Sequence, residues 1–442
     1  MKKRVVSLLL ALPLTLCALP ALADAGQRAE ILTYQDIQVV VNGESVPVQD
    51  MEPFILNGRV YIPADLAPNA RWDEAANTVY FEEMAQIAVP AGEDATRAVS
   101  FRCKRSGLIK ADGSLWTWGE NYLGNGEEGG SGTPVHIMGD VASISMGNGT
   151  SLAIRKDGSL WAWGDNQEYT VGNGQDRGKQ LTPVKILEDV VRASAGYETA
   201  AAVTADGGLY LWGSNRDGNL AADMLKGGPA KYMTPTRVME GVADVSCNAY
   251  DRDAYVLALK QDGTVWSWGF NSYGQLGDGQ TDLQAQLYVL DGGNYGRPRY
   301  DWQPRQILEG VIAIDAGSAF AAALKADGTL WTWGRDEKGC LGNGGITNAV
   351  GIYNKPCQSI PMQILDGVTA VRLGAYHGLA LKTDGTLWAW GDRYGNVPVQ
   401  LPIEGVVAFG AGFNSSIAVK ADGTVWAWAV WNDPAQIPDI TR

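Results

Sequence analysis

The sequence predicts an all-β protein, a seven-bladed β-propeller that follows a small N-terminal β-rich domain. One phrase, Asp-Gly-x-x-aromatic-x-Trp followed by a small residue, occurs seven times at intervals of 38–65 residues. An apolar strand precedes each copy, and no segment shows helical periodicity. Seven units of short strands are typical of a propeller. The phrases begin at Asp112, Asp157, Asp206, Asp262, Asp327, Asp384 and Asp422.

Each phrase predicts a β-hairpin. In the second copy, the apolar residues 151–156 lead to Asp157-Gly158, and the chain then continues into Trp161-Ala162-Trp163. Asp-Gly favours a two-residue turn because glycine adopts a positive φ without steric penalty. Tryptophan alternates with small residues, so we expect the bulky face of this strand to fill the space between neighbouring blades.

Two further phrases complete each unit. One is an apolar strand such as residues 141–147 or 311–317, and the other is a Pro-x-x-Ile phrase such as residues 183–186. The Pro-x-x-Ile phrase returns at residues 434–437, after the last Trp-x-Trp. We therefore expect this last strand to pair with the first blade near residues 97–102, which would close the ring within one blade.

The repeats resemble those of the regulator of chromosome condensation family. The resemblance covers residues 96–442 and is plainest at residues 262–279, Asp-Gly-Thr-Val-Trp-Ser-Trp-Gly-Phe-Asn-Ser-Tyr-Gly-Gln-Leu-Gly-Asp-Gly. It implies a seven-bladed propeller, and the founding eukaryotic member is a nuclear guanine nucleotide exchange factor. Because fold does not transmit function, we expect neither exchange activity nor a small GTPase partner. Secreted bacterial inhibitors of β-lactamase are a nearer analogy, by fold and compartment only.

The first 23 residues predict a signal peptide. Lys2, Lys3 and Arg4 precede an apolar run, and Ala21-Leu22-Ala23 offers the small residues that a signal peptidase accepts. We expect cleavage after Ala23 and a secreted or cell-surface protein. Lipoprotein processing at Cys17 is the weaker alternative, because Leu16 stands where a small residue is wanted. No later stretch has the roughly 20 apolar residues of a transmembrane segment.

The segment before the propeller is a different domain. Residues 24–83 alternate apolar runs with Asn-Gly and Asp-rich turns, and they resemble the copper amine oxidase N-terminal-like domain, a stalk module in secreted bacterial proteins. Residues 84–95 are interpreted as a linker. Residues 24–83 contain no His and no Cys, so no copper site, other metal site or cofactor is expected.

Charge argues against nucleic acid as a partner. The formal net charge is -14, and the Lys and Arg residues are scattered through the repeats without a basic run. A protein that binds phosphates needs a basic face to release counterions. We therefore expect an extracellular protein or a cell-surface ligand as the partner.

The sequence offers little for catalysis. The chain has only His136 and His377, in different repeats, and His377 occupies a blade position that other repeats fill with residues such as Thr150 or Phe320. The Gly-rich residues 124–132 lack the Lys-Ser or Lys-Thr of a phosphate loop. A catalytic carboxylate pair depends on three-dimensional separation, so a carbohydrate-active enzyme stays as an alternative. The main prediction is a protein that is not an enzyme.

Four cysteines remain after cleavage, and their spacing matches no zinc site. Cys340 and Cys357 lie in the same insertion of repeat 5. In an oxidising compartment we expect a disulfide between them. Cys247 falls on an apolar strand, which is typical of a buried small hydrophobic residue.

Long insertions predict the binding surface. Residues 214–234, 270–303 and 335–360 enlarge the same connection in repeats 3, 4 and 5, and they would emerge on one face. We interpret the protein as a non-enzymatic binding scaffold, with a β-lactamase-inhibitor-like protein as the first alternative. Packing of the loop aromatics onto the propeller rim is the competing interpretation of the repeat 4 loop. The candidate binding residues of that loop are Tyr288, Tyr295, Arg297, Arg299, Tyr300 and Trp302.

Overall fold

The computed structural model describes most of residues 105–442 and, before them, only the short strands β1–β8. Residues 111, 223–227, 249, 251–253, 282–299, 352–353, 430–431 and 442 are not described, apart from the strands β23 (Val289–Leu290) and β24 (Asn294–Tyr295). The chain forms two units, Met1–Glu93 and Asp94–Arg442.

The first unit is built from strands, as its turn-rich sequence predicts. A five-stranded sheet has the order β3-β2-β1-β7-β6, and a separate hairpin pairs β4 with β5. The strand β1 lies inside the predicted signal peptide and pairs with β2 and β7. The bounds are β1 Arg4–Ser7, β2 Val39–Val41, β3 Glu44–Val46, β4 Phe54–Leu56, β5 Arg59–Tyr61, β6 Ala70–Asp73 and β7 Thr78–Phe81.

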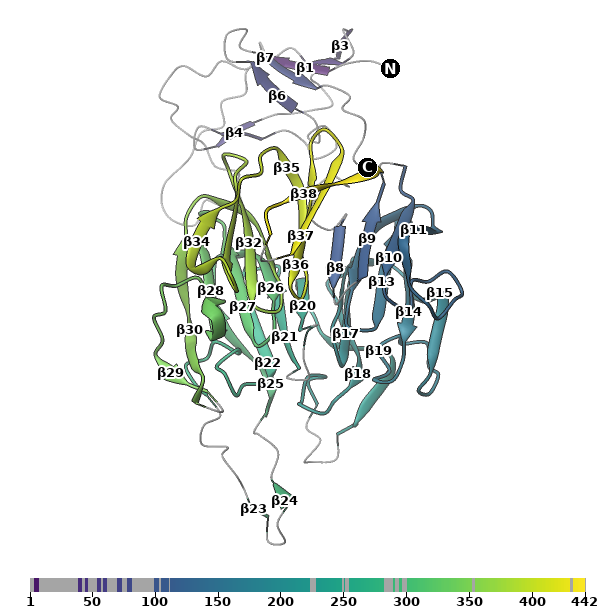
Figure 1. Cartoon of the computed structure of the whole chain (residues 1–442), viewed down its shortest axis with the longest axis vertical. Helices are drawn as coiled ribbons and strands as arrows, with labels where there is room; N and C mark the ends of the chain where they lie inside the picture. Colours follow the sequence, from purple (N-terminus) through teal and green to yellow (C-terminus); the bar gives the residue numbers. More distant parts are fainter. Residues whose placement is uncertain are drawn as a thin grey trace. The chain divides into compact units, whose positions relative to one another are not determined.

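The second unit is a seven-bladed β-propeller, which confirms the predicted fold class (Figure 1). The first strands of neighbouring blades contact one another, so they line the axis. Blade 1 contains β8 (Val99–Arg102), β9 (Arg105–Ile109), β10 (Leu115–Gly119) and β11 (Ser131–Met138). Blade 2 contains β12 (Val141–Met146), β13 (Thr150–Arg155), β14 (Leu160–Asp165) and β15 (Lys179–Leu187). Blade 3 contains β16 (Val190–Ala195), β17 (Thr199–Thr204), β18 (Leu209–Ser214) and β19 (Lys231–Met239).

Blades 4 to 7 repeat this arrangement, with an added outer strand in blade 5. Blade 4 contains β20 (Val242–Cys247), β21 (Tyr255–Lys260), β22 (Val265–Phe270) and β25 (Tyr300–Leu308). Blade 5 contains β26 (Val311–Ala316), β27 (Phe320–Lys325), β28 (Leu330–Arg335), the one-turn helix η7 (Glu337–Gly339), β29 (Ala349–Val350) and β30 (Pro356–Leu365). Blade 6 contains β31 (Val368–Leu373), β32 (His377–Lys382), β33 (Leu387–Gly391) and β34 (Gly395–Gln400), and blade 7 contains β35 (Val406–Ala411), β36 (Ser415–Lys420), β37 (Thr424–Ala429) and β38 (Ala435–Thr441).

The expected closure of the ring is wrong. The last strand, β38, pairs with β37 of its own blade, where Trp426 lies opposite Gln436. The strand β8 is the inner strand of blade 1 and pairs with β9. Every blade therefore ends, rather than begins, with its proline-containing outer strand, and all seven blades are continuous in sequence. The ring closes where β8 packs against β35, without sharing a sheet.

The Asp-Gly turns have the predicted geometry. Gly158 has φ +81°, and Asp157 Oδ1 accepts hydrogen bonds from the Ser159 N–H (2.9 Å) and hydroxyl (2.6 Å). The Ser159 hydroxyl in turn accepts from Trp161 Nε1 at 2.9 Å. The bonds from Ser159 lower the pKa of the Asp157 carboxyl. Because the same arrangement recurs at Asp262 and other turns, these aspartates act in turn formation.

The second tryptophan of each Trp-x-Trp joins neighbouring blades. In blades 3 to 6 its indole N–H donates to a backbone carbonyl of the preceding blade's loop, as Trp333 does to Gln275 (3.0 Å) and Trp212 does to Thr170 (2.8 Å). A glycine of that loop lies against the ring, and a Cβ on Gly277 would come within 2.8 Å of Trp333 Nε1. Glycine is therefore required there for the close approach as well as for its φ of +74°.

A second set of bonds links the inner strands. The Ser145 hydroxyl accepts from the Ala195 N–H of the next blade at 3.0 Å. The same bond runs from Cys247 N–H to Ser194 and from Ala316 N–H to Ser246, each at 3.0 Å. Asp315 extends the series by accepting from the Leu373 N–H at 2.7 Å. Side chains of blades 2 to 5 thus bond the next blade's backbone around the axis.

Comparing Trp163 with Trp333 measures how much the indole hydrogen bond contributes to stability. Trp163 and Trp333 are both fully buried, but Trp163 Nε1 has no partner among the described residues. The outer loops that precede these two tryptophans differ in length. From Gly119 to Leu123 the loop of blade 1 is three residues shorter than the corresponding stretch of blade 4, from Gly269 to Leu276. Trp333→Phe removes a bond that Trp163→Phe does not. We expect the free energy of unfolding to fall in both variants, and by about 1 kcal/mol more in Trp333→Phe.

Urea denaturation of the two variants and the wild type measures this difference. Both substitutions leave a similar cavity, so the cavity cost largely cancels in the comparison. Equal losses in the two variants, or a larger loss in Trp163→Phe, would show that the indole bond does not hold the blades together.

Candidate interface on the loop face

Two sets of loops open at the same end of the propeller. Neighbouring strands in every blade are antiparallel, so the loop after the inner strand and the loop after the Trp-x-Trp strand lie together. We call this end the loop face. Its inner loops are residues 147–149, 196–198, 248–254, 317–319, 374–376 and 412–414, and its outer loops are residues 120–130, 166–178, 215–230, 271–299, 336–355, 392–394 and 430–434.

The residues predicted for binding are only partly described. Trp302 lies in β25 and is half-buried, and Tyr300 begins the same strand opposite Phe270. Tyr295 belongs to β24, opposite Val289 of β23. Tyr288, Arg297 and Arg299 lie outside the described residues. The grouping of these six residues stays a prediction.

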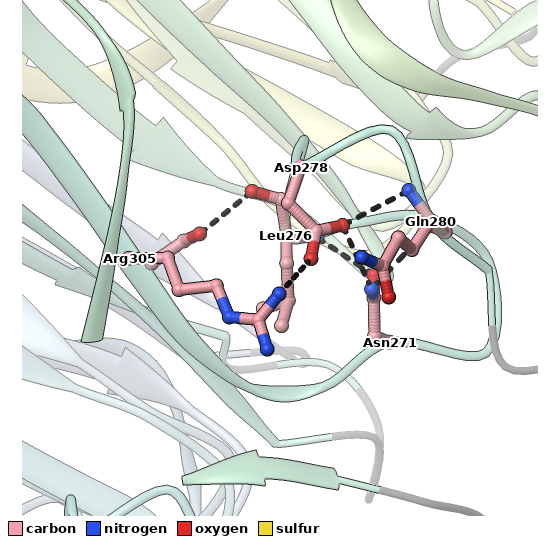
Figure 2. Close-up of polar contacts among 6 residues, drawn as sticks. Asn271, Leu276, Asp278, Gln280 and Arg305 are labelled. Atoms are coloured by element: carbon pink, nitrogen blue, oxygen red, sulfur yellow. Dashed lines mark hydrogen bonds and ion pairs between the residues drawn. The ribbon is translucent and has the colours of Figure 1, made fainter. Parts of the chain in front are cut away.

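The base of the repeat 4 loop is held by polar contacts (Figure 2). Asn271 Oδ1 accepts from the Leu276 N–H at 3.1 Å, and its amide donates to Asp278 Oδ1 at 3.2 Å. Asp278 also accepts from the Gln280 N–H (3.1 Å) and from Arg305 (3.3 Å). Asp278 therefore holds the start of the loop in place, and the first residues of the insertion have a defined position on the loop face.

A second insertion on this face escaped the sequence analysis. Blade 4 has seven residues between Cys247 and Tyr255, where blade 2 has three between Met146 and Thr150. The loop carries Tyr250, which is 6% exposed and whose hydroxyl donates to the carbonyls of Ala411 (2.8 Å) and Leu373 (3.2 Å). A loop of blade 4 thus bonds to blades 6 and 7. Counting residues between the inner strand and the next strand in each repeat would have found it.

Tyr250 belongs to an aromatic cluster with Phe413 and Tyr376. The ring centroids of Tyr250 and Phe413 lie 6.4 Å apart, and those of Tyr376 and Phe413 lie 5.9 Å apart in an edge-to-face arrangement. Phe413 is 40% exposed, whereas Tyr250 is almost fully buried at 6%. The cluster presents an apolar surface to solvent on inner loops of blades 6 and 7.

Two cations frame this cluster. The Arg335 guanidinium lies between the rings of Tyr273 and Tyr376, 5.2 and 5.0 Å from their centroids, and donates to the Ser318 carbonyl at 2.9 Å. Lys338 Nζ is 4.6 Å from the Tyr376 centroid and pairs with Asp392 at 2.8 Å. Cation–aromatic contacts fix the ring of Tyr376, so the surface is preorganised.

Blades 2 and 3 place two carboxylates on the same face. Glu198 is fully buried and accepts from Arg216 at 2.7 Å, and the other guanidinium nitrogen lies 3.8 Å from Glu168. One guanidinium of blade 3 thus lies against a carboxylate of its own blade and a carboxylate of blade 2.

The two histidines lie in different blades, His136 in blade 1 and His377 in blade 6. His377 begins β32 and is fully buried, with Nε2 3.0 Å from the Ser416 hydroxyl and no partner for Nδ1 among the described residues. Burial lowers its pKa to about 4. His136 lies edge-on to Trp116, 5.3 Å between centroids. The blade-position interpretation of His377 agrees with its place, because Thr150 and Phe320 begin the corresponding strands β13 and β27.

The expected disulfide is not formed in the structure. Cys340 and Cys357 are buried free thiols, as is Cys247. Cys340 packs in the core cluster of Trp390, and its thiol donates to the Arg335 carbonyl at 2.9 Å. Cys357 packs in a different cluster, with Tyr273. The strand pairing of β28, β29 and β30 already holds the insertion, which removes the reason for a covalent link.

Within the described part of the chain, no three His, Cys, Asp or Glu side chains are grouped as a metal site would require. Among the same residues, no helix has the length and apolar character of a membrane span.

Seven blades with the Trp-x-Trp strand define a repeat β-propeller. The model of the RCC1-like domain matches residues 82–396, which is more than half of the chain. The protein therefore belongs to the RCC1-like domain family.

Curated relatives match over short lengths. The human (Homo sapiens) E3 ubiquitin-protein ligase HERC2 is 32% identical over 156 residues, which cover 34% of this chain and 3% of HERC2. The ultraviolet-B receptor UVR8 of Arabidopsis thaliana is 28% identical over 190 residues, which cover 41% of this chain and 37% of UVR8. The matched regions thus span well under two thirds of these relatives.

Solved structures share the fold. Prp20p from Saccharomyces cerevisiae, studied for its binding to Gsp1p and histones, superposes with a TM-score of 0.58 at 19% identity over 75% of this chain and 87% of Prp20p. Human WBSCR16 has a TM-score of 0.55 at 17% identity, over 93% of this chain and 96% of WBSCR16. At these identities the likeness supports the fold alone.

The buried imidazole of His377 predicts a pH dependence of stability. Its pKa falls from 6.5 to about 4 on folding, so the folded state resists a proton that the unfolded chain accepts. The stability that the neutral imidazole contributes to the folded state is complete above about pH 6.5 and is lost as the pH falls toward 4. Between those limits the wild type should lose on the order of 3 kcal/mol more unfolding free energy than His377→Gln.

Denaturant melts of both proteins from pH 7 to pH 4.5 provide the measurement. Carboxylates titrate equally in the two proteins and cancel in the difference. Parallel profiles would mean that His377 is not neutral in the folded state.

Proposed function

We propose that the protein is a secreted or cell-surface binding scaffold without enzymatic activity, whose loop face engages an extracellular protein or surface ligand. The observation that carries the proposal is the aromatic cluster of Tyr250, Tyr376 and Phe413. It exposes a phenyl ring at the centre of a face built from loops of several blades. Residues 24–83 would serve as a stalk.

The chemistry of the cluster suits a protein interface. Tyrosine, phenylalanine and arginine are the residue types enriched at the centre of such interfaces. Arg335 and Lys338 hold Tyr376 in place before a partner arrives, so little side-chain entropy would be lost on binding. Exposure of Phe413 has a cost in water that a partner would remove.

The repeat 4 loop extends this interface in the proposal. Tyr273 of its ordered base contacts Arg335, which also contacts Tyr376, so the loop begins beside the aromatic cluster. The predicted anchors Tyr295, Tyr300 and Trp302 follow in the same insertion. The insertion of blade 4 and the inner loops of blades 6 and 7 would then bind one partner.

Alanine substitution tests the interface. In pull-downs of secreted proteins with the mature chain, Phe413→Ala combined with Tyr376→Ala should weaken capture of the specific partner by on the order of 2 kcal/mol, about 30-fold in affinity. A second set of variants tests the repeat 4 loop and consists of Tyr295→Ala, Tyr300→Ala and Trp302→Ala. Ile312→Ala, a 57% exposed position on the inner strand β26, is the control.

The melting temperature separates binding from packing. A binding role predicts lost affinity with a nearly unchanged melting temperature in both sets. A lower melting temperature with unchanged affinity would assign the substituted aromatics to packing, and capture by the double variant equal to that of the control would remove the loop face as the interface.

Export has its own test. The protein recovered outside the producing cell should have the intact mass of a chain that begins at Asp24. Ala23→Arg removes the small residue next to the cleavage point, so this variant should keep its leader. An exported chain that begins at Met1 would contradict the signal peptide, and a mass that includes acyl chains on Cys17 would support the lipoprotein alternative.

A further inference from the structure

Exposed aliphatic side chains gather on the outer loop and outer strands of blades 5 and 6. Among the described residues, five of the eight exposed large hydrophobic side chains lie there. We call these five residues the apolar rim. They are Ile346 (55% exposed), Val350 (44%), Ile360 (47%), Val397 (49%) and Val399 (37%).

The apolar rim is continuous. The outer loop of blade 5 bridges the outer strands β30 and β34, which lie along one side of the propeller with β29 (Figure 1). Gly344 N–H of this loop donates to the Asn396 carbonyl of β34 at 2.7 Å, and Asn348 accepts from the Ser359 N–H of β30 at 2.8 Å. The strand β29 also pairs with β30. The five side chains therefore belong to one surface.

This surface carries no charge. Residues 341–351, 356–365 and 395–403 contain no Asp, Glu, Lys or Arg, in a chain of formal net charge -14. The outer strands of blades 2, 3 and 4 do carry charges, listed here by strand: Lys179 and Lys185 in β15, Lys231 and Arg237 in β19, and Asp301 and Arg305 in β25. Charged side chains on outer strands oppose association, so blades 5 and 6 lack a protection that blades 2 to 4 have.

We propose that the apolar rim is the contact between two copies of this chain. Two copies repel each other at long range because both are acidic, and the repulsion is weakest where the contact surface itself adds no charge. A symmetric dimer pairs the same surface on both copies, which an uncharged apolar surface satisfies without any complementary partner. Depletion of charge at its core is the compositional mark of such an interface.

The size of the surface is adequate. A stable interface uses roughly 20–30 residues a side and buries about 800 Å² on each partner. The three uncharged segments contain 30 residues, of which 21 are exposed or half-buried, and the apolar rim lies among these 21. The inner loops that carry Tyr250, Tyr376 and Phe413 lie outside the three segments, so the inference does not rest on the proposed function.

Strand addition is not the mode of contact. Pro361 in β30 and Pro398 in β34 have no N–H to donate, so neither outer strand offers an uninterrupted ladder of donors to a new strand. The dimer therefore packs through side chains of the apolar rim.

Sedimentation or light scattering of the full chain over a dilution series tests the proposal. The wild type should have twice the chain mass at high concentration and one chain mass on dilution. Ile360→Lys and Val397→Lys should each raise the dissociation constant at least tenfold. Lysine lowers the net negative charge, so a stronger long-range repulsion between the acidic copies cannot explain a weaker dimer.

Ile312→Lys is the matched control, because Ile312 is 57% exposed on β26 and lies outside the apolar rim. It should leave the dimer intact. Added salt should preserve or strengthen the wild-type dimer, since it screens repulsion without weakening apolar contact. A wild-type monomer at every concentration would overturn the proposal, and so would a dimer that survives both lysine substitutions in variants with unchanged melting temperatures.

Discussion

The insertion of a tryptophan beneath the loop of the preceding blade is the contact on which the rest of the propeller depends. Trp333 needs three things at once: a glycine that leaves room for its ring, a carbonyl that accepts its N–H, and small residues on the strands around it. Gln275 and Gly277 of the blade 4 loop supply the carbonyl and the glycine. The blade 4 loop and blade 5 are therefore specified together, and the long insertion of repeat 4 follows Gly277.

Much of the fold could be predicted from the sequence because its determinants are local. Asp-Gly turns and alternating apolar residues fix each hairpin, and seven copies fix the blade number. The strand at which each blade begins could not be predicted in the same way. A periodic sequence does not show which of its four strands is the outer one, so residues 434–437 were assigned to the wrong blade.

The candidate site was less accessible to prediction, because it depends on residues brought together by the closed ring. Phe413 and Tyr376 lie in short loops of ordinary length, and Tyr250 reaches them across two blades. Composition drew attention to the longest insertion instead. The cysteines show the converse problem, since 17 residues of separation suggested a link, whereas packing places Cys340 and Cys357 in separate clusters.

Continuity of each blade in sequence has a consequence for how such chains change. The connection between β11 and β12 at Gly139-Asp140 could be opened, as could the corresponding connection after any other blade, and every sheet would keep all of its strands. Circular permutation and duplication of a whole repeat therefore alter the order or number of blades without breaking a ladder.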